Sequence, residues 1–167
     1  MEEQIKIRKA TQEDVAAMLK IYNNEVKTST ATFDLKEKTL EEWQVWFEQH
    51  GDEIHPIFVA DIDGCIGGYA SLSRYREKEA FQSTVELSVY VDKQYRNRGI
   101  AGSLMEYMIQ YAKGIEGIHC IVSVITTGNA VSTHLHKKYG FIYAGTIHEV
   151  GMKFGAYCGI DNYELLL

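Results

Sequence analysis

Hydrophobic residues recur along this chain with two different periods, and together they predict an alternation of strands and helices. Alternating or unbroken apolar runs are typical of strands, whereas apolar residues three or four positions apart are typical of helices. Helices are predicted after Thr11 and Thr39, and at Ile100–Lys113 and Asn129–Lys138. The predicted strands are Ile5–Lys9, Ile57–Ile62, Cys65–Ser73, Thr84–Val91, His119–Ile125, Phe141–Val150 and Asn162–Leu167. This order predicts a mixed α/β (α+β) fold, in which an antiparallel meander precedes strand–helix–strand units.

Local signals support several of these boundaries. Thr39 followed by Glu42 is a capping box, which marks the start of a helix. Asp63-Gly64 between two apolar runs predicts a tight hairpin, and the polar residues 74–82 predict a loop. The segment Thr84–Val91 alternates almost strictly, so Val85, Leu87, Val89 and Val91 should share one face. The opposite face should then carry Glu86, Ser88 and Tyr90.

Composition limits the class of protein. A chain of 167 residues with 46% hydrophobic and 24% charged residues fits one domain over residues 1–167. A net charge of −6 argues against a nucleic-acid partner, although a local site can still attract an anion. The chain has neither an apolar run that could span a membrane nor the apolar core of a signal peptide, so the cytoplasm is expected. The three cysteines, Cys65, Cys120 and Cys158, are expected to be buried free thiols.

The segment after Thr84–Val91 has the composition of an anion-binding turn. Backbone N–H groups at a helix start, helped by the helix dipole, can converge on a diphosphate. Gly99 lets the backbone approach closely, and Ala101 and Gly102 leave the first helical turn bare. Arg96 and Arg98 can add charge-assisted contacts. These residues alone are equally compatible with a solvated turn that uses glycine for its geometry.

Two motifs, one after the other along the chain, make the functional prediction more specific. Arg96-x-x-Gly99-x-Ala101 and the later Asn129-x-x-Ser132-x-x-Leu135-His136-x-x-x-Gly140-Phe141 resemble the signatures of the GNAT superfamily of N-acetyltransferases. The resemblance implies the GNAT fold, a mostly antiparallel sheet whose central strands splay apart to admit acetyl-CoA. By resemblance, the donor would contact Val89, Tyr90, Val91, Arg96, Arg98, Gly99, Ile100, Ala101, Gly102, Ser103, Asn129 and Ser132.

Further segments resemble the phosphinothricin and methionine-sulfone acetyltransferase branch of that superfamily. They include Ile7–Asp14, Thr84–Val91 and Val150–Gly155, and they run over nearly the whole chain. This resemblance implies a homodimer that acetylates the α-amino group of small amino acids with a tetrahedral phosphinate, sulfone or sulfoximine group. The chain departs from the branch at Tyr75, where tryptophan is usual, and at Leu87, where histidine is usual. These departures concern the acceptor rather than the fold or the donor.

Two residues are candidates for proton transfer. Glu86, on the polar face of its strand, is predicted to be a general base acting through a water molecule. A carboxylate that only binds the acceptor's ammonium group, or a structural ion pair, is the alternative. By resemblance, His136 stands where relatives place a tyrosine that protonates the departing sulfur, and an imidazole can do the same near neutral pH. It is an equally good candidate for a hydrogen bond to the coenzyme.

The acceptor site is expected around Arg76. Its guanidinium matches a carboxylate or a tetrahedral oxyanion, although charged loops of this kind are usually just solvated. Tyr75 and Phe33 are predicted to line the site, and Lys153 to approach it from a partner subunit. No metal is expected, because His134 and His136 fall on different faces of a helix.

Other functions stay open at this stage. The alternative acceptors are a protein N-terminus and an aminoglycoside. An enzyme that acts on either is expected to have an open acidic groove. A non-catalytic CoA-sensing domain would keep the donor site without turnover. Glu86 and His136 argue against a sensing domain, because pure binding needs neither a base nor an acid beside the thioester.

Overall fold

One sheet of seven strands, in the order β1-β2-β3-β4-β5-β7-β6, forms the centre of the computed structural model, which describes residues 4–167. The first three residues of the domain predicted over 1–167 therefore lie outside the described part. Neighbouring strands are antiparallel except β4 and β5, which run parallel. The strands are β1 (Ile5–Lys9), β2 (Ile57–Ile62), β3 (Cys65–Arg74), β4 (Thr84–Val91), β5 (Cys120–Thr126), β6 (Ile142–Lys153) and β7 (Ala156–Leu166).

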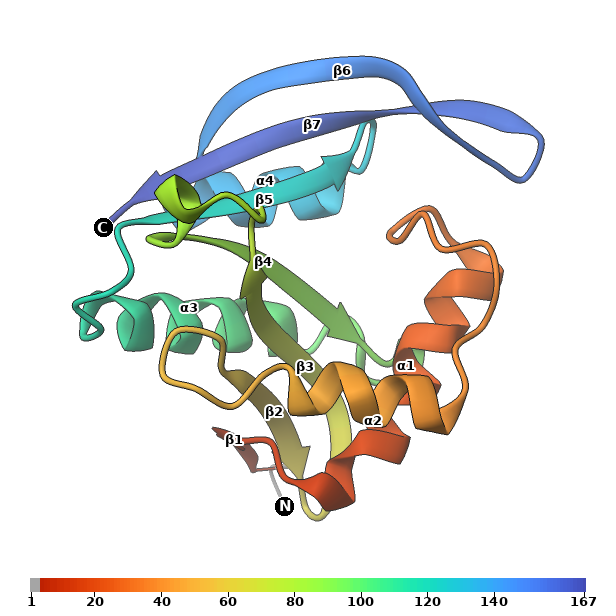
Figure 1. Ribbon diagram of the computed structural model, residues 1–167. Helices are drawn as coiled ribbons and strands as arrows, with labels where there is room; N and C mark the ends of the chain where they lie inside the picture. The colour runs from red at the N-terminus through yellow and green to blue at the C-terminus, as the bar shows by residue number, and fades with distance from the viewer. Residues whose placement is uncertain (1–3) are drawn as a thin grey trace.

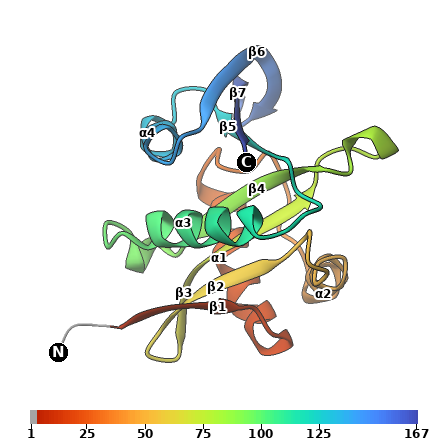
Figure 2. The ribbon, with the colours of Figure 1, turned by 90° about the vertical axis from the view of Figure 1, so that its left-hand side faces the viewer.

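Four α-helices cover this sheet. α3 lies on one face of β1–β4, and α1 and α2 lie on the other, while α4 packs beside β5 and β7 (Figures 1 and 2). No helix among residues 4–167 is long and apolar enough to cross a membrane. The helices are α1 (Val15–Thr28), α2 (Leu40–Glu48), α3 (Ile100–Lys113) and α4 (Ala130–Lys138), with short 3-10 turns at Gln12–Asp14, Glu79–Phe81 and Lys93–Tyr95.

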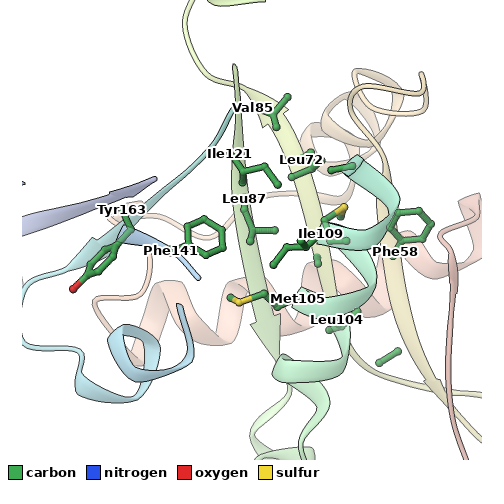
Figure 3. Packing of buried hydrophobic residues seen from close by; sticks show 14 of the residues in the cluster. Phe58, Leu72, Val85, Leu87, Leu104, Met105, Ile109, Ile121, Phe141 and Tyr163 are labelled. Carbon is green, nitrogen blue, oxygen red and sulfur yellow. The ribbon is translucent and has the colours of Figure 1, made fainter. Parts of the chain in front are cut away.

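The main core lies between α3 and the sheet. Val85 and Leu72 of the sheet belong to the same buried cluster as Leu104 and Met105 of α3, and all four side chains are 0% exposed (Figure 3). A second cluster on the opposite face joins α1 and α2 to β2 and β3. The predicted alternation of β4 is confirmed, because its valines and Leu87 pack into the first cluster.

Several predicted boundaries of helices and turns are confirmed, together with the hydrogen bonds or backbone angles expected there. α3 occupies the predicted residues and is capped at its end by Gly114. At the start of α2, the Glu42 N–H donates to Thr39 Oγ1 at 3.2 Å, and the Thr39 N–H donates to Glu42 Oε2 at 2.8 Å. Asp63 and Gly64 both have positive φ, as their two-residue hairpin turn requires.

Two expectations are wrong. The closing strands, predicted at Phe141–Val150 and Asn162–Leu167, are instead one long ribbon in which β6 and β7 meet at the turn Phe154–Gly155. The ribbon is exposed over much of its length, so burial imposes no simple alternation on its sequence. The cysteines are free as expected but not buried, since Cys65 is exposed and the other two are partly exposed.

Candidate active site

The sheet is split between β4 and β5. Only Thr84, Val85 and Glu86 of β4 pair with β5, opposite Cys120, Ile121 and Val122. Beyond Glu86 the two strands diverge, and the rest of β5 pairs with β7 alone (Figures 1 and 2). The edge of β4 over Leu87–Val91 that faces β5, called here the open edge, thus has no strand partner among residues 4–167. An extended ligand with amide groups can pair with such an edge as an added strand.

The strand with the open edge leads directly into the predicted anion-binding turn. Gly99, the N-cap of α3, has φ +77°, and no atom lies within 4 Å of the position its Cβ would take. The N–H of Ser103 already donates to the Gly99 carbonyl at 3.0 Å. The N–H groups of Ile100, Ala101 and Gly102 precede it and have no acceptor within the helix. The turn therefore presents converging donors beside open space, which fits a diphosphate.

The two arginines of this turn differ in what they contact. Arg96 forms an ion pair with Glu25 of α1, a carboxylate that is only 5% exposed and also accepts from Ser29. The guanidinium of Arg98 lies 5.2 Å from the centre of the Tyr95 ring. The guanidinium of Arg96 is thus paired with α1, whereas that of Arg98 lies beside Tyr95 in the turn.

Glu86 is the last residue of β4 before the split. Its side chain is half-buried on the face opposite α3, across from Ser73 of β3. Burial raises the pKa of its carboxyl group above the usual value. No hydrogen bond or ion pair engages this carboxylate within residues 4–167. A carboxylate that is partly desolvated and unpaired is well suited to accept a proton.

His136 is held by its own helix. Its Nδ1 is 2.8 Å from the Ser132 carbonyl, so this nitrogen carries the proton and donates it. The ring is 6% exposed and packs edge-on against Phe141, with centroids 5.0 Å apart. Burial lowers the pKa of the imidazole, although the bond to Ser132 opposes the shift. Asn129 caps the same helix, because its Oδ1 accepts from the Ser132 N–H at 3.2 Å.

The predicted acceptor residues lie in two places. Tyr75 and Arg76 contact each other in one loop, and Phe33 and Lys153 lie at the end of β6. Arg76 is exposed and lies over the rings of Tyr75 and Phe81, with its Cζ 5.0 and 5.5 Å from their centres. Phe33 packs closely against Gly151 of β6. Lys153 was expected to reach the site from a partner subunit, but it is buried in its own chain. Its Nζ donates to the Thr32 carbonyl at 2.7 Å.

A polar cavity under α2 was missed by sequence reasoning. The cavity holds about 380 Å³ and lies on the same sheet face as Glu86. Trp43, Tyr69 and Ser71 were not among the candidate site residues. One signal was available, since serines stand at alternate, inward-facing positions of β3. Among residues 4–167, no group of three or more His, Cys, Asp or Glu side chains is placed to hold a metal ion.

A sheet that splits between β4 and β5, with the N-terminus of α3 following the end of β4, is the arrangement expected of an acyl-CoA-dependent transferase. The chain belongs to the acetyltransferase (GNAT) family, whose model matches residues 7–161. It is an acetyl-CoA-dependent N-acetyltransferase, as that family and its solved members indicate.

Curated relatives cover nearly the whole chain. An L-methionine sulfoximine/L-methionine sulfone acetyltransferase of Pseudomonas aeruginosa is 37% identical over 162 residues, or 96% of this chain and 94% of that protein. A phosphinothricin N-acetyltransferase of Streptomyces coelicolor is 35% identical over 164 residues, covering 96% and 95% of the two chains.

Solved structures agree with this fold. An acetyltransferase of Salmonella typhimurium, solved with its cofactor acetyl-CoA, matches with a TM-score of 0.93 and 31% identity over 98% of this chain and 94% of that one. A ribosomal-protein-alanine N-acetyltransferase of Brucella melitensis matches with a TM-score of 0.93 and 35% identity over 97% and 99% of the two chains. The fold is therefore shared by relatives named for different acceptors.

Proposed function

We propose that this protein, as one domain over residues 1–167, acetylates the α-amino group of a small amino acid of the phosphinothricin, methionine sulfone or methionine sulfoximine type. The observation that carries the proposal is the unpaired, half-buried carboxylate of Glu86 at the point where β4 and β5 separate. A base in this position serves an amine that must become neutral before it attacks. The names of the curated relatives support the same class of acceptor.

The donor would lie along the open edge and end at the turn. Backbone groups of Val89 and Val91 would pair with the extended arm of acetyl-CoA, and the first N–H groups of α3 would hold its diphosphate. Arg98 is placed to add charge there. Bound acetyl-CoA supplies the activated acetyl thioester. A backbone N–H of β4 would polarise its carbonyl.

Glu86 would take the proton from the acceptor's ammonium group, directly or through water. The amine nitrogen then forms a bond to the acetyl carbon, the carbon–sulfur bond breaks, and the nitrogen releases its second proton to solvent. His136 fits a contact to the coenzyme better than a proton donor, because its proton sits on the Nδ1 that faces Ser132. Sulfur can leave as the thiolate and gain its proton from solvent. Arg76 would attract the acceptor's carboxylate.

An acceptor panel tests the function. The protein is incubated with acetyl-CoA and phosphinothricin, methionine sulfone, a peptide or an aminoglycoside, and free thiol is measured. Release is expected with the amino acids alone. Release only with the peptide would contradict the acceptor class, and release with none would contradict the catalytic proposal.

The pH dependence of kcat/KM tests the role of Glu86. The raised pKa means that the carboxylate is protonated, and inactive as a base, at low pH. We expect kcat/KM to rise as pH increases through this pKa, and Glu86→Gln to lose both the rise and roughly 100-fold in rate at neutral pH. Glu106→Gln, on the exposed side of α3, is the matched control. An unchanged profile in Glu86→Gln would remove Glu86 from the mechanism.

A homodimer in the cytoplasm completes the proposal. Apolar side chains are exposed along the ribbon of β6 and β7. Monomeric proteins rarely expose a large contiguous apolar patch to water. Met152 and Tyr157 are directly opposite each other there and are 53% and 64% exposed. A second copy of the chain would cover these side chains. The cytoplasmic location rests on the sequence alone.

A further inference from the structure

The segment between α1 and α2 reaches from one part of the split sheet to the other. α1 packs on β2 and β3 in the second hydrophobic cluster, so the segment begins on the part formed by β1–β4. Residues 29–34, called here the strap, then contact β5 and β6, which belong to the other part. In Figure 1 the chain after α1 extends toward the ribbon of β6 and β7. The strap thus bridges the two parts of the sheet.

Two side chains of the second part donate to the backbone of the strap. The Thr126 hydroxyl, at the end of β5, donates to the Thr30 carbonyl at 2.5 Å. The Lys153 Nζ, at the end of β6, donates to the Thr32 carbonyl at 2.7 Å. The two accepting carbonyls are two residues apart, and the two donors come from different strands. The strap is therefore fastened to both β5 and β6.

Lys153 brings a buried charge to its contact. The residue is 4% exposed, and its Nζ lies 5.1 Å from the centre of the Phe154 ring. Burial lowers the pKa of Lys153, while the nearby charges of Asp34 and Glu25 oppose the shift. A hydrogen bond from a charged donor is stronger than one from a neutral donor. We therefore expect the bond to Thr32 to hold the strap more firmly than the bond from β5.

The strap is also tied to α1 and, through α1, to the donor turn. The Tyr22 hydroxyl of α1 donates to Asp34 in the strap. The Ser29 hydroxyl donates to Glu25 at 2.5 Å, and Glu25 pairs with Arg96 of the turn before α3. The strap therefore connects β5 and β6 with the turn that would hold the diphosphate of the donor.

The strap and the pairing of β4 with β5 lie at opposite ends of the split. The two strands pair only over residues 84–86 and 120–122, at their starts, whereas Thr126 is the last residue of β5. One end of the gap is thus closed by backbone hydrogen bonds, and the other end is spanned by the strap. A gap held at both ends keeps its width, and a site that is already shaped for its ligand binds that ligand at a lower entropic cost.

We propose that the strap sets the separation of β4 and β5, and that Lys153 and Thr126 are positioning residues for acetyl-CoA. Neither side chain needs to touch the donor, because both act through the backbone of the strap. The inference rests on the donor site proposed above, and it does not depend on which amine is acetylated. Because binding is reciprocal, a strap that favours the donor must itself be held more firmly once the donor is bound.

Hydrogen exchange measures how firmly the strap is held. Lys153→Met and Thr126→Val each remove a hydrogen-bond donor and keep most of the side chain. We expect the amides of residues 29–34 to exchange roughly 10- to 100-fold faster in Lys153→Met and about 3- to 10-fold faster in Thr126→Val. Lys137→Met, at an exposed position of α4, is the control and should leave this exchange unchanged. Unchanged exchange in both strap variants would overturn the proposal.

Calorimetric titration with acetyl-CoA tests the link between the strap and the donor. We expect the Kd to rise about 5-fold or more in Lys153→Met, and acetyl-CoA to slow the exchange of the wild-type strap by a similar factor. Arg98→Met should weaken acetyl-CoA binding without loosening the strap, because Arg98 lies in the donor turn itself. Faster strap exchange with an unchanged Kd would overturn the proposal.

The two measurements keep this inference separate from the proposed function. Both follow the binding of acetyl-CoA and need no acceptor. A wild type that releases no thiol with any acceptor would contradict the proposed function, while a loosened strap and a raised Kd in Lys153→Met would still support the strap. Normal acetyl transfer with an unchanged Kd in both strap variants would overturn the strap and leave the proposed function intact.

Discussion

Arg96 and Glu25 show how single residues join the donor turn to the rest of the site. They are 71 positions apart in sequence, and their ion pair connects the turn before α3 to the C-terminal half of α1. Ser29, which also contacts Glu25, begins the segment that carries Phe33. The same segment is held by Thr126, whose hydroxyl donates to the Thr30 carbonyl at 2.5 Å. Arg96 therefore links the turn before α3 to the segment that carries Phe33.

Arg96→Met should destabilise the fold. The substitution leaves the buried carboxylate of Glu25 without its partner, which costs about 1–3 kcal/mol. For a domain of this size the melting temperature should fall by roughly 2–4 °C for each kcal/mol. Adding Glu25→Gln should recover part of the loss, because it removes the uncompensated charge. Arg98→Met is the control, and an equal loss in both single variants would argue against the ion pair.

At the scale of elements, the unit of β4, turn and α3 would place the donor in the proposed function. The left-handed conformation of Gly99 turns the chain so that the first N–H groups of α3 point back past the end of β4. Asn97 also has positive φ, at 62°. Two such residues within one turn explain why the turn is tight and why it needs a glycine.

Gly99→Ala separates backbone strain from donor binding. Alanine in this conformation costs about 1 kcal/mol, and its methyl group would enter the open space beside the helix start. We expect acetyl-CoA to bind roughly 10-fold more weakly in a calorimetric titration. Gly64→Ala has similar strain, with φ +88° and open space, but lies in the distant β2–β3 hairpin. It should lose similar stability and no affinity, and equal affinity losses would contradict the assignment of the turn.

Elements were predictable from sequence where one face is buried. The alternation of β4 and the spacing of α3 follow from packing against each other, so the bounds of both were correct. The ribbon after Phe141 was only partly predicted, because exposed strands carry apolar residues without a fixed period. The only sequence signal of the cavity was the pair of serines at alternate positions of β3, which does not reveal a cavity by itself. Trp43 and Tyr69 come from elements far apart in sequence, and space left empty between them depends on how α2 sits over β3.

At the scale of the whole molecule, the exposed ribbon of β6 and β7 is the expected contact surface of the proposed dimer. β6 is an edge strand, and its apolar side chains would favour self-association in an uncontrolled way if no partner covered them. A two-fold dimer buries the same patch on both copies and closes the assembly.

Met152→Lys combined with Tyr157→Lys should therefore yield monomers. The two positions face each other across the ribbon, so the variant places like charges at the centre of the expected contact. Sedimentation velocity on the wild type is expected to show a dimer. Val131→Lys is the control, since this valine is 83% exposed but lies alone on α4. A variant that stays dimeric would place the interface elsewhere.

The split after Glu86 gives the enzyme a stability that depends on its own substrate. A sheet interrupted at its centre has two parts that can open separately, and opening of this kind exposes backbone to proteases. A donor arm that pairs with the open edge of β4 would fill the gap between the parts, and at a hundred times its dissociation constant a ligand adds about 2.7 kcal/mol. We therefore expect the folded protein to resist proteolysis best where acetyl-CoA is abundant, and digestion with and without the donor measures the difference.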